Sequence, residues 1–228
     1  MAKCDRHIDV NTSEWCWKCQ ELTDNERFES IKSLNKLKKM KIIFLDNDGV
    51  ICLHNNWGGR AKKWSKYRSE NPESSNFKSD APVSVRFDDF DKKAIKILNE
   101  ILEETGAEIV VSSDWRYHAT LEELGEYYLS QGISKKPIGV TKRLGECDQP
   151  ENFIWSRQWD LEQSRSLEIL QYLRDNPEVT EWVAIDDLDM GNGEEWKKWG
   201  LTNFVLTPKS TEGIKQSGIK EKVIKYLM

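Results

Sequence analysis

From residue 41 onward, short runs of apolar residues alternate with longer segments in which apolar residues recur at helical spacing. The short runs predict buried strands and the longer segments predict amphipathic helices. The predicted strands are residues 41–46, 108–112, 181–186 and 203–206. The predicted helices are residues 90–105, 118–130, 162–174 and 211–227. Because strands that alternate with helices build a parallel sheet with helices on both faces, we predict a three-layer α/β domain over residues 41–228.

Two polar segments interrupt this alternation, at residues 53–86 and 141–160. Long connections in a compact α/β domain usually bind ligands or cover a site. In parallel sheets, ligands bind beyond the carboxyl ends of the strands, where such insertions would lie. We therefore predict that residues 53–86 are a small cap-like insertion in the domain.

The first forty residues differ from the rest, because they carry a cluster of metal-ligand side chains. The cluster has two pairs with two-residue spacing: Cys4 and His7, then Cys16 and Cys19. Such pairs suit one tetrahedral Zn²⁺, and four protein ligands make the ion structural. We predict a zinc-binding module at residues 1–22 and a connecting helix at residues 23–40. The alternatives are four unrelated side chains or a redox pair at Cys16 and Cys19.

Composition narrows the class of protein. The chain has 228 residues, of which 32% are charged and 38% hydrophobic, as in ordinary soluble globular proteins. It contains no apolar run near the roughly 18 residues that span a membrane, and its N-terminus lacks the apolar region of a signal peptide. We expect a cytoplasmic protein whose five cysteines form no disulfide framework. The net charge of −5 disfavours broad electrostatic binding of nucleic acid.

Three predicted strands end in polar residues. These ends read Asp46-Asn47-Asp48-Gly49, then Ser112-Ser113-Asp114-Trp115-Arg116, then Asp186, Asp187 and Asp189. If the strands are adjacent and parallel, the carboxylates gather at one edge of the sheet and repel one another unless a cation neutralises them. Oxygen ligands of this kind suit Mg²⁺, and the serines and the arginine suit phosphate. Taken singly, the motifs are also typical of a tight turn and of a helix N-cap.

The combination of these motifs resembles the haloacid dehalogenase (HAD) superfamily, which has a Rossmann-like fold. The resemblance implies that Asp46 is a nucleophile that forms an aspartyl-phosphate. It implies that Asp48 protonates the leaving group and then activates water, and that Ser112 binds the transferred phosphoryl group. Asp186 and Asp187 would hold Mg²⁺ together with Asp46 and the backbone carbonyl of Asp48. The presence of Asp48 implies phosphoryl transfer, since the dehalogenases of the superfamily lack this second aspartate.

The stretches "VVSSDWR" and "SRSLEILQYL" are similar to the HAD domain of Swiss Army Knife RNA repair proteins. Those domains carry a serine pair followed by Trp-Arg, and an arginine just before a helix. The resemblance makes Arg165 the cation that offsets phosphate charge, and Ser113 and Arg116 further phosphate or substrate contacts. The chain departs from the pattern by inserting Asp114 before the tryptophan. Arg143 and Arg157 are alternatives for the cation.

Residues 54–68, the basic-aromatic segment, bear on the class of substrate. Its cations are Arg60, Lys62, Lys63, Lys66 and Arg68, and its interleaved aromatic residues are Trp57, Trp64 and Tyr67. Such a mixture stacks bases and follows phosphates in single-stranded nucleic acids. The alternatives are a cap over a small-metabolite site and a solvated loop whose tryptophans pack on the core.

These observations predict a Mg²⁺-dependent phosphomonoester hydrolase that works through an aspartyl-phosphate. The predicted substrate is a nucleotide or a phosphorylated nucleic-acid end. One alternative is a small-metabolite phosphatase. The other is a zinc-containing module that binds nucleic acid or protein on a HAD scaffold.

Overall fold

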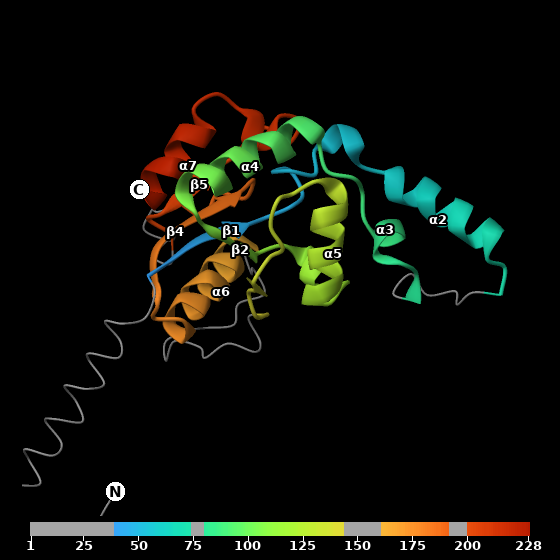
Figure 1. Ribbon diagram of the computed structural model, residues 1–228, viewed down its shortest axis with the longest axis horizontal. Coiled ribbons are helices and arrows are strands. Elements are labelled where there is room, and N and C mark those ends of the chain that lie inside the picture. Colours follow the sequence, from blue (N-terminus) through green and yellow to red (C-terminus); the bar gives the residue numbers. More distant parts are fainter. Residues whose placement is uncertain (1–38, 74–79, 144–160, 192–199) are drawn as a thin grey trace, which may run out of the picture. The chain divides into compact units, whose positions relative to one another are not determined.

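Five parallel strands form the centre of the fold, in the order β3-β2-β1-β4-β5 (Figure 1). They are β1 (Met40–Leu45), β2 (Glu108–Val111), β3 (Gly139–Val140), β4 (Val179–Asp186) and β5 (Phe204–Leu206). The computed structural model describes residues 39–73, 80–143, 161–191 and 200–228. The described strands and helices belong to one compact unit, Met40–Met228. The predicted parallel α/β sheet is therefore confirmed.

The central strand β1 lies between β2 and β4, and the register of pairing aligns their carboxyl ends. Leu45 pairs with Val111 of β2 on one side and with Ile185 of β4 on the other. The residues that follow these positions therefore emerge side by side at one edge of the sheet. From β1 the chain adds β2 and β3 on one side of the sheet and then β4 and β5 on the other side. In open parallel sheets, ligands bind at the point where the strand order reverses in this way.

Apolar side chains alternate between the two faces of the sheet, as expected for strands that are buried on both sides. Ile43 and Leu45 of β1 point into a core shared with helices on one face. Those helices are α4 (Lys92–Thr105), α5 (Leu121–Gln131) and α7 (Ile219–Leu227). Ile42 and Phe44 point to the other face, where they pack against α6 (Leu161–Asp175). Figure 1 shows α4 and α7 on one side of the sheet and α6 on the other.

Local signals fix where the main helices begin and end. The Asp91 side chain accepts hydrogen bonds from the backbone of Lys93 and Ala94 at the start of α4, which ends at Gly106 in a left-handed conformation with φ 68°. Thr120 and Glu123 form a capping box at the start of α5. A helix was predicted at residues 118–130, but a short 3-10 helix, η3 (Asp114–Tyr117), precedes α5 and shortens it.

The predicted insertion contains helices that apolar periodicity does not indicate. After the 3-10 helix η1 (His54–Asn56) come α2 (Gly59–Glu70) and α3 (Val83–Arg86). Helix α2 buries none of its residues. In Figure 1, α2 and α3 extend from the α5 side of the sheet. The remaining predicted helix, 211–227, is divided into η6 (Gly213–Lys215) and α7.

Among the described residues, no helix combines the length and the apolar character needed to cross a membrane. The predicted zinc ligands Cys4, His7, Cys16 and Cys19 lie outside the described residues, as do the predicted module at residues 1–22 and all but the last two residues of the predicted helix at 23–40. Zinc binding therefore stays a prediction.

Candidate active site at the carboxyl edge of the sheet

Asp46 is the first residue after the central strand. Its backbone N–H still donates to the carbonyl of Ile185 in β4 at 3.0 Å, while the carbonyl of Leu45 accepts from Ser112 at 2.9 Å. The sheet pairing therefore continues to the point where the carboxylate leaves the strand. The Asp46 residue is 4% exposed, so its position is set by backbone hydrogen bonds and by burial.

Three carboxylates meet at this edge. One side-chain oxygen from each of Asp46, Asp186 and Asp187 lies within 4.8 Å of the others. Burial raises the pKa of Asp46 to about 6 and also raises the pKa values of Asp186 and Asp187. Mutual repulsion among the carboxylates acts in the same direction. An all-oxygen donor set whose ionisation is disfavoured by burial fits Mg²⁺, which would neutralise it.

The turn after Asp46 is shaped to admit Asp187. Gly49 has φ 74°, and a Cβ atom at this position would lie 2.2 Å from Oδ2 of Asp187. Any other residue would displace the Asp187 carboxylate and would also strain the left-handed backbone. The glycine of the motif therefore serves the acidic cluster directly.

Arg165 brings a cation into the same cluster from α6. Its Nη1 donates to Asp46 Oδ1 at 2.7 Å, to the Ser112 carbonyl at 2.8 Å and to Asp186 Oδ2 at 3.1 Å. Its Nη2 donates to Asp114 Oδ1 at 3.2 Å. The buried guanidinium lowers the pKa values of Asp46 and Asp186 and so opposes the effect of burial. The arginine singled out by the family resemblance thus lies against the residue singled out as nucleophile.

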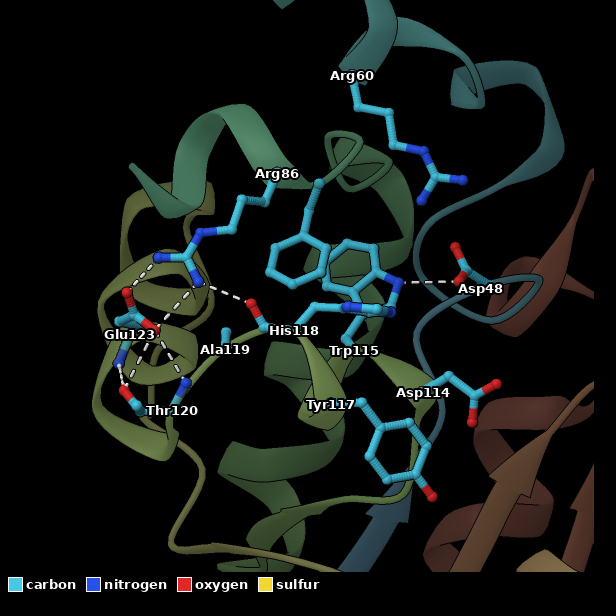
Figure 2. A pocket seen from close by; sticks show the side chains of 11 residues that line it. Asp48, Arg60, Arg86, Asp114, Trp115, Tyr117, His118, Ala119, Thr120 and Glu123 are labelled. Atoms are coloured by element: carbon cyan, nitrogen blue, oxygen red, sulfur yellow. Dashed lines mark hydrogen bonds and ion pairs between the residues drawn. The ribbon is translucent and has the colours of Figure 1, made fainter. Parts of the chain in front are cut away.

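Asp48 is oriented by a different side chain. Its Oδ2 accepts a hydrogen bond of 2.8 Å from the indole Nε1 of Trp115, as Figure 2 shows. The indole ring is itself fixed, because it stacks on Phe87 with centroids 4.2 Å apart and on Phe90 with centroids 5.3 Å apart. Burial raises the pKa of Asp48, and the Trp115 hydrogen bond partly offsets that rise.

Ser112 and Ser113 follow strand β2 and are buried. Within the described part of the chain, neither hydroxyl oxygen has a hydrogen-bond partner. The Ser113 hydroxyl nevertheless lowers the pKa of Asp46, so it faces that carboxyl group. Buried hydroxyls without partners are uncommon, and here they suit a ligand with several acceptor oxygens.

Arg116 is not brought into the acidic cluster by any described contact. Its buried guanidinium forms an ion pair with Glu168 of α6 and lies 4.5 Å above the centre of the Tyr117 ring. Its Nε and Nη1 have no hydrogen-bond partner among the described residues. Arg143 lies 5.3 Å from the centre of the same ring, and Arg157 is outside the described residues.

The basic-aromatic segment forms η1 and α2, together with the turn between them. Its aromatic rings lie close to each other, with the centroids of Trp64 and Tyr67 6.1 Å apart, and the guanidinium of Arg68 lies 5.7 Å from the Trp64 ring centre. The Nζ of Lys63 is 2.6 Å from Asp89 Oδ1. The segment is therefore mostly helical, and its cations and rings are held by contacts within the helix and with Asp89.

Two contacts of the site were not expected from the sequence. These are the indole hydrogen bond to Asp48 and the contact between Asp114 and Arg165. Asp114 and Trp115, which make these contacts, belong to the polar segment that follows β2, so the sequence did predict that they lie near this edge of the sheet. The sequence did not predict the directions of the two side chains, because these depend on the 3-10 helix η3.

Comparison with known families gives one match, whereas comparison with curated proteins and with solved structures gives none. Residues 42–218, more than half of the chain, match the HAD domain in Swiss Army Knife RNA repair proteins. The matched region includes all five strands, apart from the first two residues of β1. The chain therefore belongs to this family of HAD domains.

Proposed function

We propose that the protein is a Mg²⁺-dependent phosphomonoester hydrolase that acts on a nucleotide or on the phosphorylated end of a nucleic acid. Membership of the HAD family supports a phosphatase-type activity. The observation that carries the proposal is the position of Asp46. Its buried carboxylate accepts a hydrogen bond from a buried arginine and lies within 4.8 Å of two further carboxylates, at the edge of the sheet where a substrate can approach.

Asp46 is the nucleophile in this proposal. One of its carboxylate oxygens attacks the phosphorus atom, and the bond from phosphorus to the leaving oxygen breaks as the new bond forms. Arg165 donates to the phosphoryl oxygens and to the attacking carboxylate, which keeps the two in line. The hydroxyls of Ser112 and Ser113 supply the hydrogen bonds that the phosphoryl group needs as it moves onto Asp46.

Asp48 is the acid and then the base. It gives its proton to the leaving oxygen, which departs as an alcohol or hydroxyl group. It then removes a proton from the water molecule that attacks the aspartyl-phosphate. This second step releases inorganic phosphate and restores the Asp46 carboxylate. The raised pKa of Asp48 favours the protonated form required for the first step.

Asp46, Asp186 and Asp187, together with the backbone carbonyl of Asp48, would hold Mg²⁺. When bound, the ion neutralises the carboxylates and stabilises the negative charge of the transferred group. The three carboxyl groups then need not carry protons for the site to tolerate their burial.

The nucleotide or nucleic-acid end is favoured over a small metabolite by the basic-aromatic segment. Its rings offer stacking surfaces and its cations offer phosphate contacts on the insertion that borders the edge of the sheet. If an oligonucleotide contacts several of these cations, its hydrolysis should fall steeply with salt, while hydrolysis of an aryl phosphate should not.

The direct test measures phosphate release in Mg²⁺ and in EDTA from an aryl phosphate, sugar phosphates, nucleoside monophosphates, and oligonucleotides phosphorylated at either end. We expect release that requires Mg²⁺ and is highest on a nucleotide or an oligonucleotide end. Release from sugar phosphates alone would favour the metabolite phosphatase. Absence of release from every substrate would favour the binding module.

The Asp46→Asn variant tests the chemistry. The substitution keeps the shape of the side chain but removes the nucleophile, so the rate of hydrolysis should fall by at least about a thousandfold. The midpoint of thermal unfolding should not fall, because the amide is less costly to bury than the carboxylate. Near-normal turnover by a folded variant would remove Asp46 from the proposed role.

A further inference from the structure

A cavity of about 580 Å³ opens beside Asp48. Its lining residues include Asp48, Arg60, Phe87, Trp115, Tyr117 and Glu123. Figure 2 shows these side chains, apart from the unlabelled Phe87, arranged around the space next to the Trp115–Asp48 hydrogen bond. The volume falls within the range of roughly 300–1,000 Å³ typical of small-molecule sites and exceeds what a phosphoryl group alone requires.

The cavity lies on the leaving-group side of the reaction. Asp48, the residue that protonates the leaving oxygen in the proposed function, belongs to its lining, whereas Asp46, Arg165 and Asp186 do not. A phosphoryl group held at the acidic cluster would therefore direct the rest of the substrate past Asp48 and into the cavity. This step rests on the proposed function.

Aromatic surfaces form one wall. Tyr117 is 43% exposed and lines the cavity together with the buried rings of Trp115 and Phe87. The guanidinium groups of Arg116 and Arg143 already lie 4.5 Å and 5.3 Å from the centre of the Tyr117 ring, so an incoming base would meet the part of the ring that they leave exposed. Exposed rings of this kind stack on nucleobases with little sequence preference. The wall thus suits a leaving group that carries a flat, apolar ring.

Most of the charges in the lining already have partners. Arg86 binds Glu123 in an ion pair and donates to the carbonyls of Ala81 at 2.8 Å and His118 at 2.7 Å. Asp114 contacts Arg165 at 3.2 Å. These groups shape the cavity, and their charges are compensated within the protein.

Arg60 differs from Arg86. Its backbone N–H donates to Asp88 Oδ1 at 2.6 Å, which fixes the first turn of α2 over the cavity. Its side chain is 54% exposed, and its Nε lies 3.6 Å from Asp88 Oδ2. In Figure 2 the terminal nitrogens of Arg60 project into the space above Asp48. A guanidinium presented in this way binds a phosphate through two parallel hydrogen bonds.

We propose that this cavity holds a nucleoside-sized leaving group and that Arg60 binds a second phosphate on it. The preferred substrates are then nucleotides that carry one phosphate to be removed and another that is retained. A phosphorylated end of a nucleic acid satisfies this requirement through its neighbouring phosphodiester, whereas a nucleoside monophosphate does not.

The test compares adenosine 3′,5′-bisphosphate with adenosine 3′-monophosphate and adenosine 5′-monophosphate in Mg²⁺. Chromatography of the products identifies which phosphate leaves, and kcat/KM is then compared with that of the monophosphate carrying the same leaving position. We expect a preference for the bisphosphate of about tenfold or more, since one charged hydrogen-bonding group supplies it. Arg60→Gln should reduce the preference to about twofold or less. Lys96→Gln, which removes an equal charge from the exposed face of α4, should retain it.

The outcomes separate this inference from the proposed function. Hydrolysis of an aryl phosphate without any preference for the bisphosphate overturns the inference alone. The inference is also overturned if Arg60→Gln lowers kcat/KM equally for the bisphosphate and the monophosphate, because an equal loss indicates a general disturbance of the site. Absence of hydrolysis from every phosphate ester overturns both. An activity-independent measurement uses Asp46→Asn: calorimetry should show tighter binding of the bisphosphate than of either monophosphate, and Arg60→Gln in that background should abolish the difference.

Discussion

A hydrogen bond of 2.8 Å from Trp115 orients the carboxylate of Asp48. The indole ring cannot turn away, because Phe87 and Phe90 stack against it. The acid of the proposed reaction is therefore held by a side chain outside the acidic cluster of Asp46, Asp186 and Asp187. Trp115 is a positioning residue in this arrangement.

Trp115→Phe should expose this role through its dependence on the leaving group. Phenylalanine keeps a ring for stacking but loses the N–H donor, so Asp48 would be less well aimed. We expect hydrolysis of an alkyl phosphate, whose leaving oxygen needs a proton, to fall by roughly ten- to a hundredfold. Hydrolysis of 4-nitrophenyl phosphate, a good leaving group, should fall much less. The measurement is kcat on both esters.

Trp182→Phe provides the matched control, because Trp182 packs edge-on against Phe44 on the opposite face of the sheet. It should cost a similar amount of packing without changing the ratio of the two rates. An equal loss on both esters in Trp115→Phe would instead indicate a purely structural tryptophan.

Gly49→Ala tests how closely the turn approaches Asp187. The added Cβ atom would lie 2.2 Å from Asp187 Oδ2, so the carboxylate must move. We expect the Mg²⁺ concentration for half-maximal activity to rise by at least about tenfold, in line with losses seen when metal-ligand positions are disturbed. Gly106→Ala is the control: its φ of 68° imposes a comparable backbone strain, but nothing lies within 4 Å of its Cβ. An unchanged Mg²⁺ requirement in Gly49→Ala would contradict the predicted crowding.

At the scale of elements, helix α2 depends on a residue far from it in the chain. Gly58, at its N-cap, offers no side chain, and the buried carboxylate of Asp88 instead accepts from the backbone of Gly58 at 3.3 Å and Arg60 at 2.6 Å. Because α2 buries no residue, these hydrogen bonds to Asp88 are a main contact that holds the start of the helix to the domain.

Asp88→Ala should therefore loosen α2. Loss of a helix cap costs about 1 kcal/mol, and the amides at the start of α2 should exchange with solvent roughly five- to tenfold faster. Hydrogen exchange followed by mass spectrometry measures the effect. Asp91→Ala is the control, since Asp91 caps α4 in the same manner and should accelerate exchange in α4 alone. Unchanged exchange in α2 would show that other contacts hold it.

Sequence patterns predicted some elements better than others, for physical reasons. Helix α4 has an apolar face that includes Ala94, Leu98 and Ile101, and its bounds were predicted within two residues. Helix α2 was missed because it buries none of its residues and has no continuous apolar face. Strand β3 was missed because two residues, Gly139 and Val140, carry no readable period. Apolar periodicity in a sequence arises from burial, so it does not indicate elements that bury few side chains.

At the scale of the whole molecule, parallel topology explains why the candidate site was largely predictable. Once β1, β2 and β4 are recognised as parallel neighbours, the residues after them must meet at one edge. Asp46, Ser112 and Asp186 do so. This argument did not determine the partners of the long side chains. The position of Arg165 against Asp46 was expected only from the family resemblance, and the ion pair of Arg116 with Glu168 was not expected at all.

In the proposed function, the acidic cluster links folding to metal binding. Burial raises the pKa values of Asp46, Asp48, Asp186 and Asp187 above their ordinary values. A carboxyl group whose pKa is raised in the folded state binds its proton more tightly there than in the unfolded chain. Its contribution to stability is therefore complete below its ordinary pKa and is lost as the pH rises through the folded value. For Asp46 this window runs from 3.8 to about 6.

Without metal, the midpoint of thermal unfolding should therefore fall by about 5 °C between pH 5 and pH 7.5, measured by calorimetry in EDTA. Saturating Mg²⁺ should remove most of this fall, because it binds the ionised cluster of the folded state alone, and its stabilising effect should be smaller at pH 5. Asp187→Asn should raise the midpoint in EDTA at pH 7.5 and weaken the response to Mg²⁺. Asp189→Asn, two residues further along and outside the cluster, should leave both unchanged. A midpoint that is insensitive to Mg²⁺ at pH 7.5 would contradict a metal site formed by these carboxylates.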